Sequence, residues 1–185
     1  MEIIRDTKDF KINMPTAVCI GKFDGVHIGH QKLLKIIAGQ KQRGLSPAVF
    51  TFDPSPEELF TGRKIEALCT KEAKEEMFEH MGIDIVVEFP LDMESAAMEP
   101  EDFVREVLIE RMNMRYIAAG SDISFGRGGK GDRALIEQLS RTYGFECVII
   151  NKVLADGEEV SSTRIRKAVA DGQIGEAKRL LGRVY

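Results

Sequence analysis

The sequence contains little of what a disulfide framework or a metal centre requires. Its three cysteines are odd in number and far apart, so we expect no disulfide framework and infer a reducing, cytoplasmic compartment. Its three histidines include one close pair, His27 and His30. The third, His80, belongs to a distant acidic segment, which argues against a zinc site because zinc needs further ligands nearby.

The chain also lacks a long apolar run and an excess of positive charge. No stretch approaches the roughly 18 apolar residues of a membrane span, so we expect no membrane partner. The net charge of −4 gives no support to nonspecific nucleic-acid binding, which depends on lysine and arginine. The charge is uneven, because residues 63–110 hold 5 basic and 14 acidic side chains, whereas residues 161–185 hold 6 basic and 2 acidic ones. A polyanionic ligand is therefore expected near the C-terminal segment.

Apolar runs and helical patterns alternate along the 185 residues, which fit a single domain. This alternation predicts an α/β fold, with a doubly wound parallel sheet of about five strands and helices on both faces. Ligands then bind at the carboxyl ends of the strands, where the strand order reverses. The expected strands lie near 17–21, 47–51, 84–88, 116–120 and 146–150, and the expected helices at 29–43, 70–81, 100–112, 132–143, 162–171 and 173–181.

The most informative segment is 21–30, Gly-Lys-Phe-Asp-Gly-Val-His-Ile-Gly-His, between the first predicted strand and helix. Glycines let a ligand approach the backbone, and a helix N-terminus offers free N–H groups to an anion. His27 and His30 are three residues apart, so both can face one ligand and stabilise growing phosphate charge. The alternative is a helix start with incidental histidines.

Three further segments could carry chemistry. Ser161 to Arg166 either caps a helix or turns hydroxyls and a guanidinium toward a phosphate. The glycine-rich segment 120–132 offers Phe125 for stacking, Asp122 for a metal or hydroxyl, and Arg127 as a cation, or is simply a flexible loop. Residues 51–56 contain two prolines that would stiffen a loop beside the site, or form a plain turn.

These four segments, in this order, resemble the FMN adenylyltransferase module of bacterial FAD synthetase over about residues 14–183. The histidine signature matches 21–31, a Thr-Phe-x-Pro segment matches 51–54, an Asp-Phe-x-Phe-Gly loop matches 122–126, and a Ser-Ser-Thr-x-Ile-Arg segment matches 161–166. The resemblance implies a Rossmann-like nucleotidyltransferase domain. Its reaction would transfer AMP from ATP to the phosphate of FMN, giving FAD and pyrophosphate, with Mg²⁺ and no covalent intermediate.

The resemblance also assigns roles to individual residues. His27, His30 and Arg166 would be the catalytic residues, with the histidines on the ATP phosphates. The remaining ATP-binding residues would be Gly21, Phe23, Gly29, Ser162 and Thr163. Residues Phe52, Asp53, Pro54, Asp122, Phe125 and Arg127 would border the flavin, and Asp122 would also be the metal contact.

The sequence departs from the family pattern at two positions and keeps two alternatives open. Ser55 stands where the family usually has histidine, and Ile123 where it usually has phenylalanine. A related nucleotidyltransferase acting on another phosphorylated acceptor is therefore the second hypothesis, and a nonenzymatic nucleotide or flavin sensor is the third. We expect the riboflavin kinase module to be absent from residues 1–185, in which case a separate riboflavin kinase could supply FMN.

Overall fold

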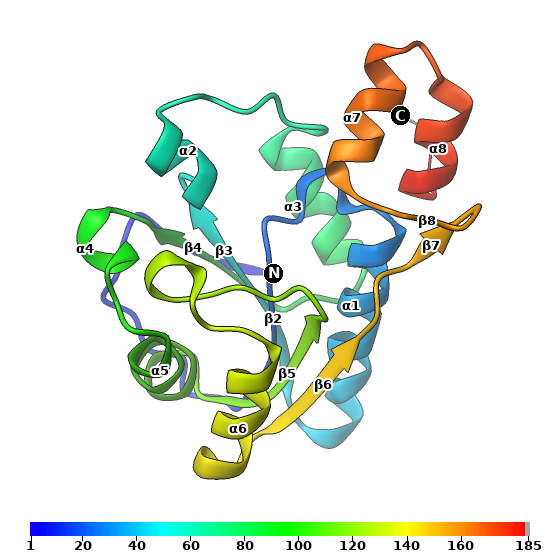
Figure 1. Cartoon of the computed structure of the whole chain (residues 1–185). Helices are drawn as coiled ribbons and strands as arrows, with labels where there is room; N and C mark the ends of the chain where they lie inside the picture. The colour runs from blue at the N-terminus through cyan, green and yellow to red at the C-terminus, as the bar shows by residue number, and fades with distance from the viewer. Residues whose placement is uncertain (184–185) are drawn as a thin grey trace.

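The computed structural model describes residues 1–183, and its centre is a parallel sheet of six strands (Figure 1). The strands are β1 (Glu2–Arg5), β2 (Thr16–Ile20), β3 (Ser46–Asp53), β4 (Ile85–Pro90), β5 (Met114–Gly120) and β6 (Glu146–Ile150). They lie in the order β1-β4-β3-β2-β5-β6. The chain moves outward from β2 through β3 to β4 and then crosses to β5, so the strand order reverses between β2 and β5.

The predicted parallel sheet is confirmed, with one strand more than the sequence indicated. The additional strand, β1, lies at the edge of the sheet and pairs with β4, from Glu2 beside Ile85 to Arg5 beside Glu88. Its four residues are too few to show a reliable period. The partner strand lies some 80 residues further along the chain, so the pairing depends on tertiary structure.

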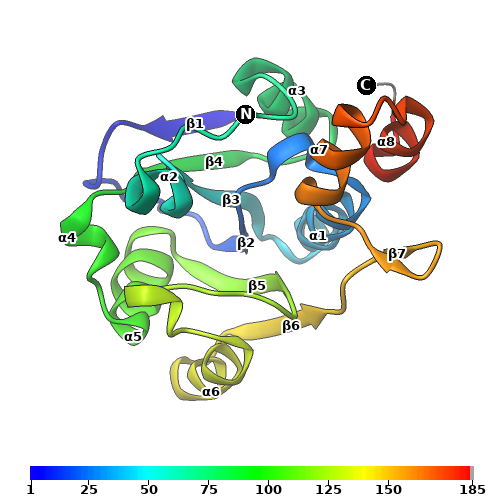
Figure 2. The ribbon, with the colours of Figure 1, turned by 45° about the horizontal axis from the view of Figure 1, so that its top comes forward.

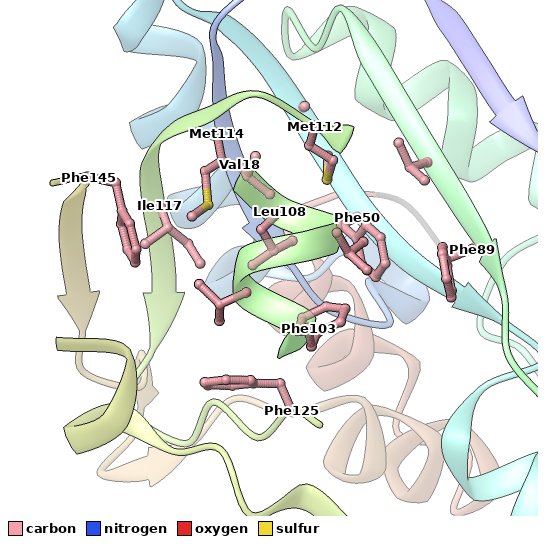
Figure 3. Close-up of a cluster of buried hydrophobic side chains, with 14 of the residues drawn as sticks. Val18, Phe50, Phe89, Phe103, Leu108, Met112, Met114, Ile117, Phe125 and Phe145 are labelled. Atoms are coloured by element: carbon pink, nitrogen blue, oxygen red, sulfur yellow. The ribbon is translucent and has the colours of Figure 1, made fainter. Parts of the chain in front are cut away.

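Both faces of the sheet are covered, as expected for a doubly wound fold. Side chains alternate between the faces along each strand, so that Val18 enters one core while Ala17 and Cys19 enter the other. Figure 3 shows the first core, in which strand residues such as Phe50 and Ile117 meet Phe103 and Leu108. The second core joins Leu34, Ile37 and Phe78 to the opposite face.

The helices divide between these two cores (Figure 2). On the first face lie α5 (Pro100–Asp102), its π-helical continuation η3 (Phe103–Arg111) and α6 (Arg133–Tyr143). On the second lie α1 (Ile28–Ala38), continued by the 3-10 helix η2 (Gly39–Arg43), and α3 (Lys71–His80). The predicted helices 29–43 and 100–112 therefore exist, but each changes its hydrogen-bonding pattern part of the way along.

The structure also contains short elements beyond the predicted helices and strands. They are α2 (Pro56–Thr61), α4 (Met93–Ala96) and the hairpin of β7 (Leu154–Ala155) with β8 (Glu158–Glu159). Ser55 and Glu58 form a reciprocal capping box that begins α2. The Ser-x-x-Glu spacing of this box is a readable signal for a helix start.

The last two helices, α7 (Ser162–Ala170) and α8 (Ile174–Leu181), form a separate apolar cluster with Leu68. The cluster packs against the 3-10 helix η1 (Asp24–Val26), where a Cβ on Gly25 would lie only 2.9 Å from the Leu68 side chain. Gln31 links the start of α1 to the end of α8 by donating to the carbonyl of Leu181 at 2.7 Å. These contacts fix the C-terminal helices beside the histidine segment.

Two further findings concern the cysteines and the helices of residues 1–183. All three cysteines, Cys19, Cys69 and Cys147, are free thiols. Burial in the second core raises the pKa of the Cys19 thiol far above its usual range, which makes Cys19 a packing residue. Among residues 1–183, no helix is both long enough and apolar enough to cross a bilayer.

Candidate active site

A cavity of about 470 Å³ opens at the carboxyl ends of β2, β3, β5 and β6. Its wall includes Ile20 at the end of β2 and Gly120 at the end of β5, so it lies at the reversal of strand order. This is the position at which doubly wound sheets bind ligands. We call it the histidine cavity, because both His27 and His30 line it.

A second cavity, of about 420 Å³, adjoins the first and is lined by Asp24 and Arg166. We call it the arginine cavity. Lys22, Phe52 and Ser55 line both cavities and therefore form the wall between them. His27 and His30 therefore line one cavity, and Arg166 lines the neighbouring one.

The two histidines are held as a stacked pair. Their ring centroids are 3.6 Å apart and their planes differ by 15°. His27 is the N-cap residue of α1, and its Nδ1 accepts the backbone N–H of His30 at 3.3 Å. Because Nδ1 is an acceptor, the neutral His27 ring carries its proton on Nε2. His30 Nδ1 is buried and has no hydrogen-bond partner within residues 1–183.

Burial keeps both imidazoles uncharged. It lowers the pKa of His27 to about 4, although the nearby Asp24 carboxylate acts in the opposite direction. It also holds the pKa of His30 well below its usual value, and the neighbouring His27 adds to that effect. Near neutral pH the pair therefore offers N–H donors to a ligand without its own positive charge.

Arg166 is held at the arginine cavity by two partners from other parts of the chain. Its Nε donates to the carbonyl of Glu66 at 2.9 Å, and its Nη2 is bound to the Asp24 carboxylate. The protein itself therefore already occupies part of the Arg166 guanidinium. Its remaining donors can still serve a ligand, since arginine carries five N–H groups.

The start of α7 brings Ser162 to the histidine cavity and leaves Thr163 outside its wall. Ser161 caps the helix by accepting the N–H of Arg164 at 3.2 Å. Ser162 donates its hydroxyl to the carbonyl of Asp24 at 2.9 Å. Ser161 therefore caps the helix, while the neighbouring Ser162 faces the ligand cavity.

Gly21 and Gly29 line the histidine cavity as expected, but Phe23 does not. The Phe23 ring is fully buried in the second core, 5.1 Å from the His30 ring and 5.7 Å from the Phe78 ring. Burial of an aromatic ring of this size stabilises the folded state, and the second core accommodates the Phe23 ring. Phe23 thus supports the back of His30 and is not part of the cavity wall.

On the expected flavin side, Phe52 lines both cavities and Asp53 lines the arginine cavity. The Asp53 carboxylate is 3.3 Å from the ammonium of Lys71. Pro54 follows Asp53 and lies outside the walls of both cavities. Asp122 and Ile123, which follow β5, also line the histidine cavity.

Phe125 and Arg127 lie away from both cavities. Phe125 is buried in the first core, with its ring 6.1 Å from that of Phe103. Gly131, bridged to Phe125 by two backbone hydrogen bonds, has no side chain and so leaves space for this ring. Arg127 is exposed and forms an ion pair with Glu99 at 3.0 Å.

Sequence reasoning missed some residues of the walls. Lys22 and Asp24 lie within the histidine segment but received no role, and Asn151, Lys152 and Val153 follow β6. A usable signal existed for the last three, because residues that follow a parallel strand lie at the ligand-binding edge of the sheet.

The donor set suits a Mg²⁺ ion that arrives with a polyphosphate. Within residues 1–183 no three His, Cys, Asp or Glu side chains gather in a group that could hold a metal ion. Asp122 offers one exposed carboxylate at the histidine cavity, with its Oδ2 3.3 Å from the ammonium of Lys152. One carboxylate together with substrate phosphates and water is a common Mg²⁺ environment.

The fold and the cavity together define the class of protein. It is a doubly wound α/β protein with a histidine-lined ligand cavity at the reversal of strand order. Residues 9–164 match the family model described as FAD synthetase, and the chain belongs to this family. A bifunctional riboflavin kinase/FMN adenylyltransferase of Listeria monocytogenes is 34% identical over 184 residues, covering 97% of this chain and 57% of that protein. The protein of the same description from Escherichia coli K12 is 33% identical, covering 90% and 54%. The chain spans a little over half the length of these relatives.

Solved structures support the fold. A Streptococcus pneumoniae structure described as a macrolide-efflux protein has a TM-score of 0.85 and 28% identity, covering 98% of this chain and 70% of that one. A pantoate-beta-alanine ligase of Francisella tularensis has a TM-score of 0.56 and 14% identity, covering 95% and 77%. At that identity the second likeness concerns the fold alone.

Proposed function

We propose that the chain is an FMN adenylyltransferase, which transfers AMP from ATP to FMN and releases FAD and pyrophosphate. Membership of the FAD synthetase family supports this activity, as do relatives described as bifunctional riboflavin kinase/FMN adenylyltransferases. The observation that carries the proposal is the stacked pair of His27 and His30, which lines a cavity at the reversal of strand order.

The reaction needs no covalent enzyme intermediate. An oxygen of the FMN phosphate attacks the α-phosphorus of ATP, a new P–O bond forms, and the bond to the β-phosphate breaks. The electron pair of that bond leaves with pyrophosphate, so negative charge grows on the leaving group. The protein mainly has to align the two phosphates and stabilise this charge.

In this proposal the imidazoles act as donors to the ATP phosphates. His27 would donate from Nε2, because its Nδ1 is already an acceptor within the protein. His30 lies directly against it, so both rings can address the same phosphate region. Donors fixed before the reaction stabilise developing charge without reorganisation, which is the main electrostatic route to catalysis.

The start of α7 and the guanidinium of Arg166 would hold the remaining phosphates. Ser162 lines the histidine cavity, and Arg166 lines the arginine cavity next to it. The polyphosphate would extend along the wall shared by the two cavities, near Lys22. Thr163 is assigned to this end as well, at the exposed first turn of α7.

Mg²⁺ would supply positive charge to the phosphates when ATP is bound, with Asp122 as the protein ligand. The flavin would lie against Phe52 and Asp122, which both line the histidine cavity near the carboxyl ends of β3 and β5. Asp53 would border it from the arginine cavity side, and Pro54, outside both cavity walls, would act by shaping the chain after Asp53. Phe125 and Arg127 belong to the same loop as Asp122 and would act by shaping that loop.

A second candidate function rests on one observation. Ser55 and Ile123, which depart from the family pattern, both line the histidine cavity. Ser55 is also committed to the capping box of α2, where its hydroxyl donates to Glu58 at 2.7 Å. A change of residue at this wall favours a related nucleotidyltransferase with another phosphorylated acceptor.

An acceptor comparison tests the proposal. The chain is incubated with ATP, Mg²⁺ and FMN, and FAD is quantified by chromatography together with released pyrophosphate. Parallel reactions contain riboflavin, which lacks the attacking phosphate, or a phosphorylated acceptor without a flavin. We expect FAD and pyrophosphate in equal amounts with FMN and no product with riboflavin. Pyrophosphate release with the other acceptor alone would favour the second candidate.

A further inference from the structure

The carboxylate of Asp24 is buried where three distant segments meet. Its side chain is 6% exposed, and Oδ1 accepts the backbone N–H of Leu68 at 2.8 Å. Oδ2 is bound to Nη2 of Arg166, and the Asp24 carbonyl accepts the hydroxyl of Ser162. One residue of the histidine segment therefore anchors both the loop before α3 and the start of α7.

These contacts fix one edge of the Arg166 guanidinium. Nε donates to the Glu66 carbonyl and Nη2 binds Asp24, so the two neighbouring donors are both used by the protein. Within residues 1–183, Nη1 makes no hydrogen bond to the protein. An arginine held along one edge presents its other end in a defined direction, because the guanidinium is rigid and planar.

Burial of a charged carboxylate costs free energy, and the contacts of Asp24 with Leu68 and Ser162 do not by themselves require a charged group. An asparagine could still accept the Leu68 N–H, and the Asp24 carbonyl would remain available to Ser162. Only the contact with Arg166 requires the negative charge. Charged hydrogen bonds are shorter and stronger than neutral ones, and they restrict a flexible side chain more firmly.

We propose that Asp24 is a positioning residue for nucleotide binding, which holds one edge of Arg166 so that its Nη1 end is available to the polyphosphate of ATP. The inference rests on the proposed function only in naming ATP as the ligand. Although Asp24 also lines the arginine cavity, its proposed role is to hold Arg166 and not to bind the nucleotide itself. It acts through Arg166, and its effect on the nucleotide must therefore disappear when Arg166 is removed.

A double-mutant cycle on ATP binding tests this dependence. Dissociation constants for Mg²⁺–ATP are measured by calorimetry for the wild type, Asp24→Asn, Arg166→Gln and the double variant, and circular dichroism checks that each is folded. Asp156→Asn is the matched control, because Asp156, between β7 and β8, forms an exposed pair with Arg179 of α8 at 2.6 Å. FAD formation is recorded in parallel for every variant.

We expect each single substitution at the Asp24–Arg166 pair to weaken ATP binding by about 10- to 100-fold, as for a lost charged hydrogen bond. The double variant should bind no more weakly than Arg166→Gln, since neighbouring residues that act as a unit are not additive. Asp156→Asn should bind as the wild type does. Multiplied losses in the double variant would show independent roles and would overturn the proposal.

Two results remain decisive if Asp24→Asn does not fold. Asp24→Ser removes the carboxylate without placing an amide N–H against Arg166, and it completes the same cycle. Arg166→Gln with wild-type ATP affinity would overturn the proposal by itself.

ATP binding with a non-additive cycle but no FAD would support the positioning role and reject the acceptor. FAD formation with an additive cycle would support the acceptor and reject the positioning role.

Discussion

The imidazole rings of His27 and His30 lie in parallel contact, 3.6 Å between centroids, at the edge of the histidine cavity. Two protonated rings at this separation would repel each other, and burial disfavours charge on either one. The free protein therefore holds a neutral pair. A bound polyphosphate adds negative charge beside them and opposes both effects, so the pair is prepared to donate to an anion.

Replacement of His30 by alanine should reduce catalysis far more than binding. We expect His30→Ala to lower kcat for FAD formation by about 100-fold, with a change in the KM for ATP of about threefold or less, because a donor aimed at developing charge acts chiefly in the transition state. Steady-state kinetics give both constants. His80→Ala, a surface histidine in α3, is the control and should match the wild type. Equal losses in kcat and in ATP affinity would indicate simple ground-state binding.

The histidine pair should make the folded state sensitive to mild acid. The pKa of His27 is about 4 when folded and 6.5 in the unfolded chain, so unfolding takes up a proton between these values. Stability from this group is complete above pH 6.5 and is lost as the pH falls toward 4. We expect a loss of about 2 kcal/mol between pH 7 and pH 5. Urea unfolding of the wild type and His27→Gln at both pH values checks this, and equal pH dependence in the two proteins would contradict it.

Two glycines of the 126–129 turn separate steric conflict from backbone conformation. Gly126 has φ +69 and ψ −172, and a Cβ there would lie 2.5 Å from the Cα of Pro100. Gly128 also has a positive φ, but a Cβ there meets nothing within 4 Å. We expect Gly126→Ala to lower the free energy of unfolding by about 3 kcal/mol or more and Gly128→Ala by about 1 to 2 kcal/mol. Chemical denaturation measures both, and similar losses would refute the close contact with Pro100.

Phe23 should be a packing residue for His30 and not a surface for the nucleotide. Its ring is fully buried against His30 and Phe78, so Phe23→Ala should cost about 3 to 5 kcal/mol of stability. The same substitution at Phe60, which is 58% exposed, should change stability by about 0.5 kcal/mol or less. Thermal and urea unfolding of both variants test this. A fully stable Phe23→Ala would contradict the assigned packing role.

Much of the fold could be predicted because its signals are local. Five of the strands are apolar runs of ordinary length, and Thr70 begins α3 by accepting the N–H of Ala73 at 3.2 Å, as its position before an amphipathic segment indicates. The strand β1 was missed because it is short and lies at the edge of the sheet. Its place is decided by pairing with β4, which no local pattern reveals.

The sequence indicated several residues of the candidate site but not which residues contact one another there. Motif and strand-end rules brought His27, His30 and Ser162 to one cavity. They could not show that Phe125 fills space beside Gly131, or that Arg166 binds Asp24 across 142 positions of sequence. Burial of an aromatic ring and the choice of an ion-pair partner depend on which segments the fold brings together.

The most direct measurement is a crystal structure of the protein with Mg²⁺ and a non-hydrolysable ATP analogue. We expect the triphosphate in the histidine cavity, with its oxygens within hydrogen-bond distance of the rings of His27 and His30 and extending toward Arg166. A nucleotide bound elsewhere, with both imidazoles left without contact to phosphate, would contradict it.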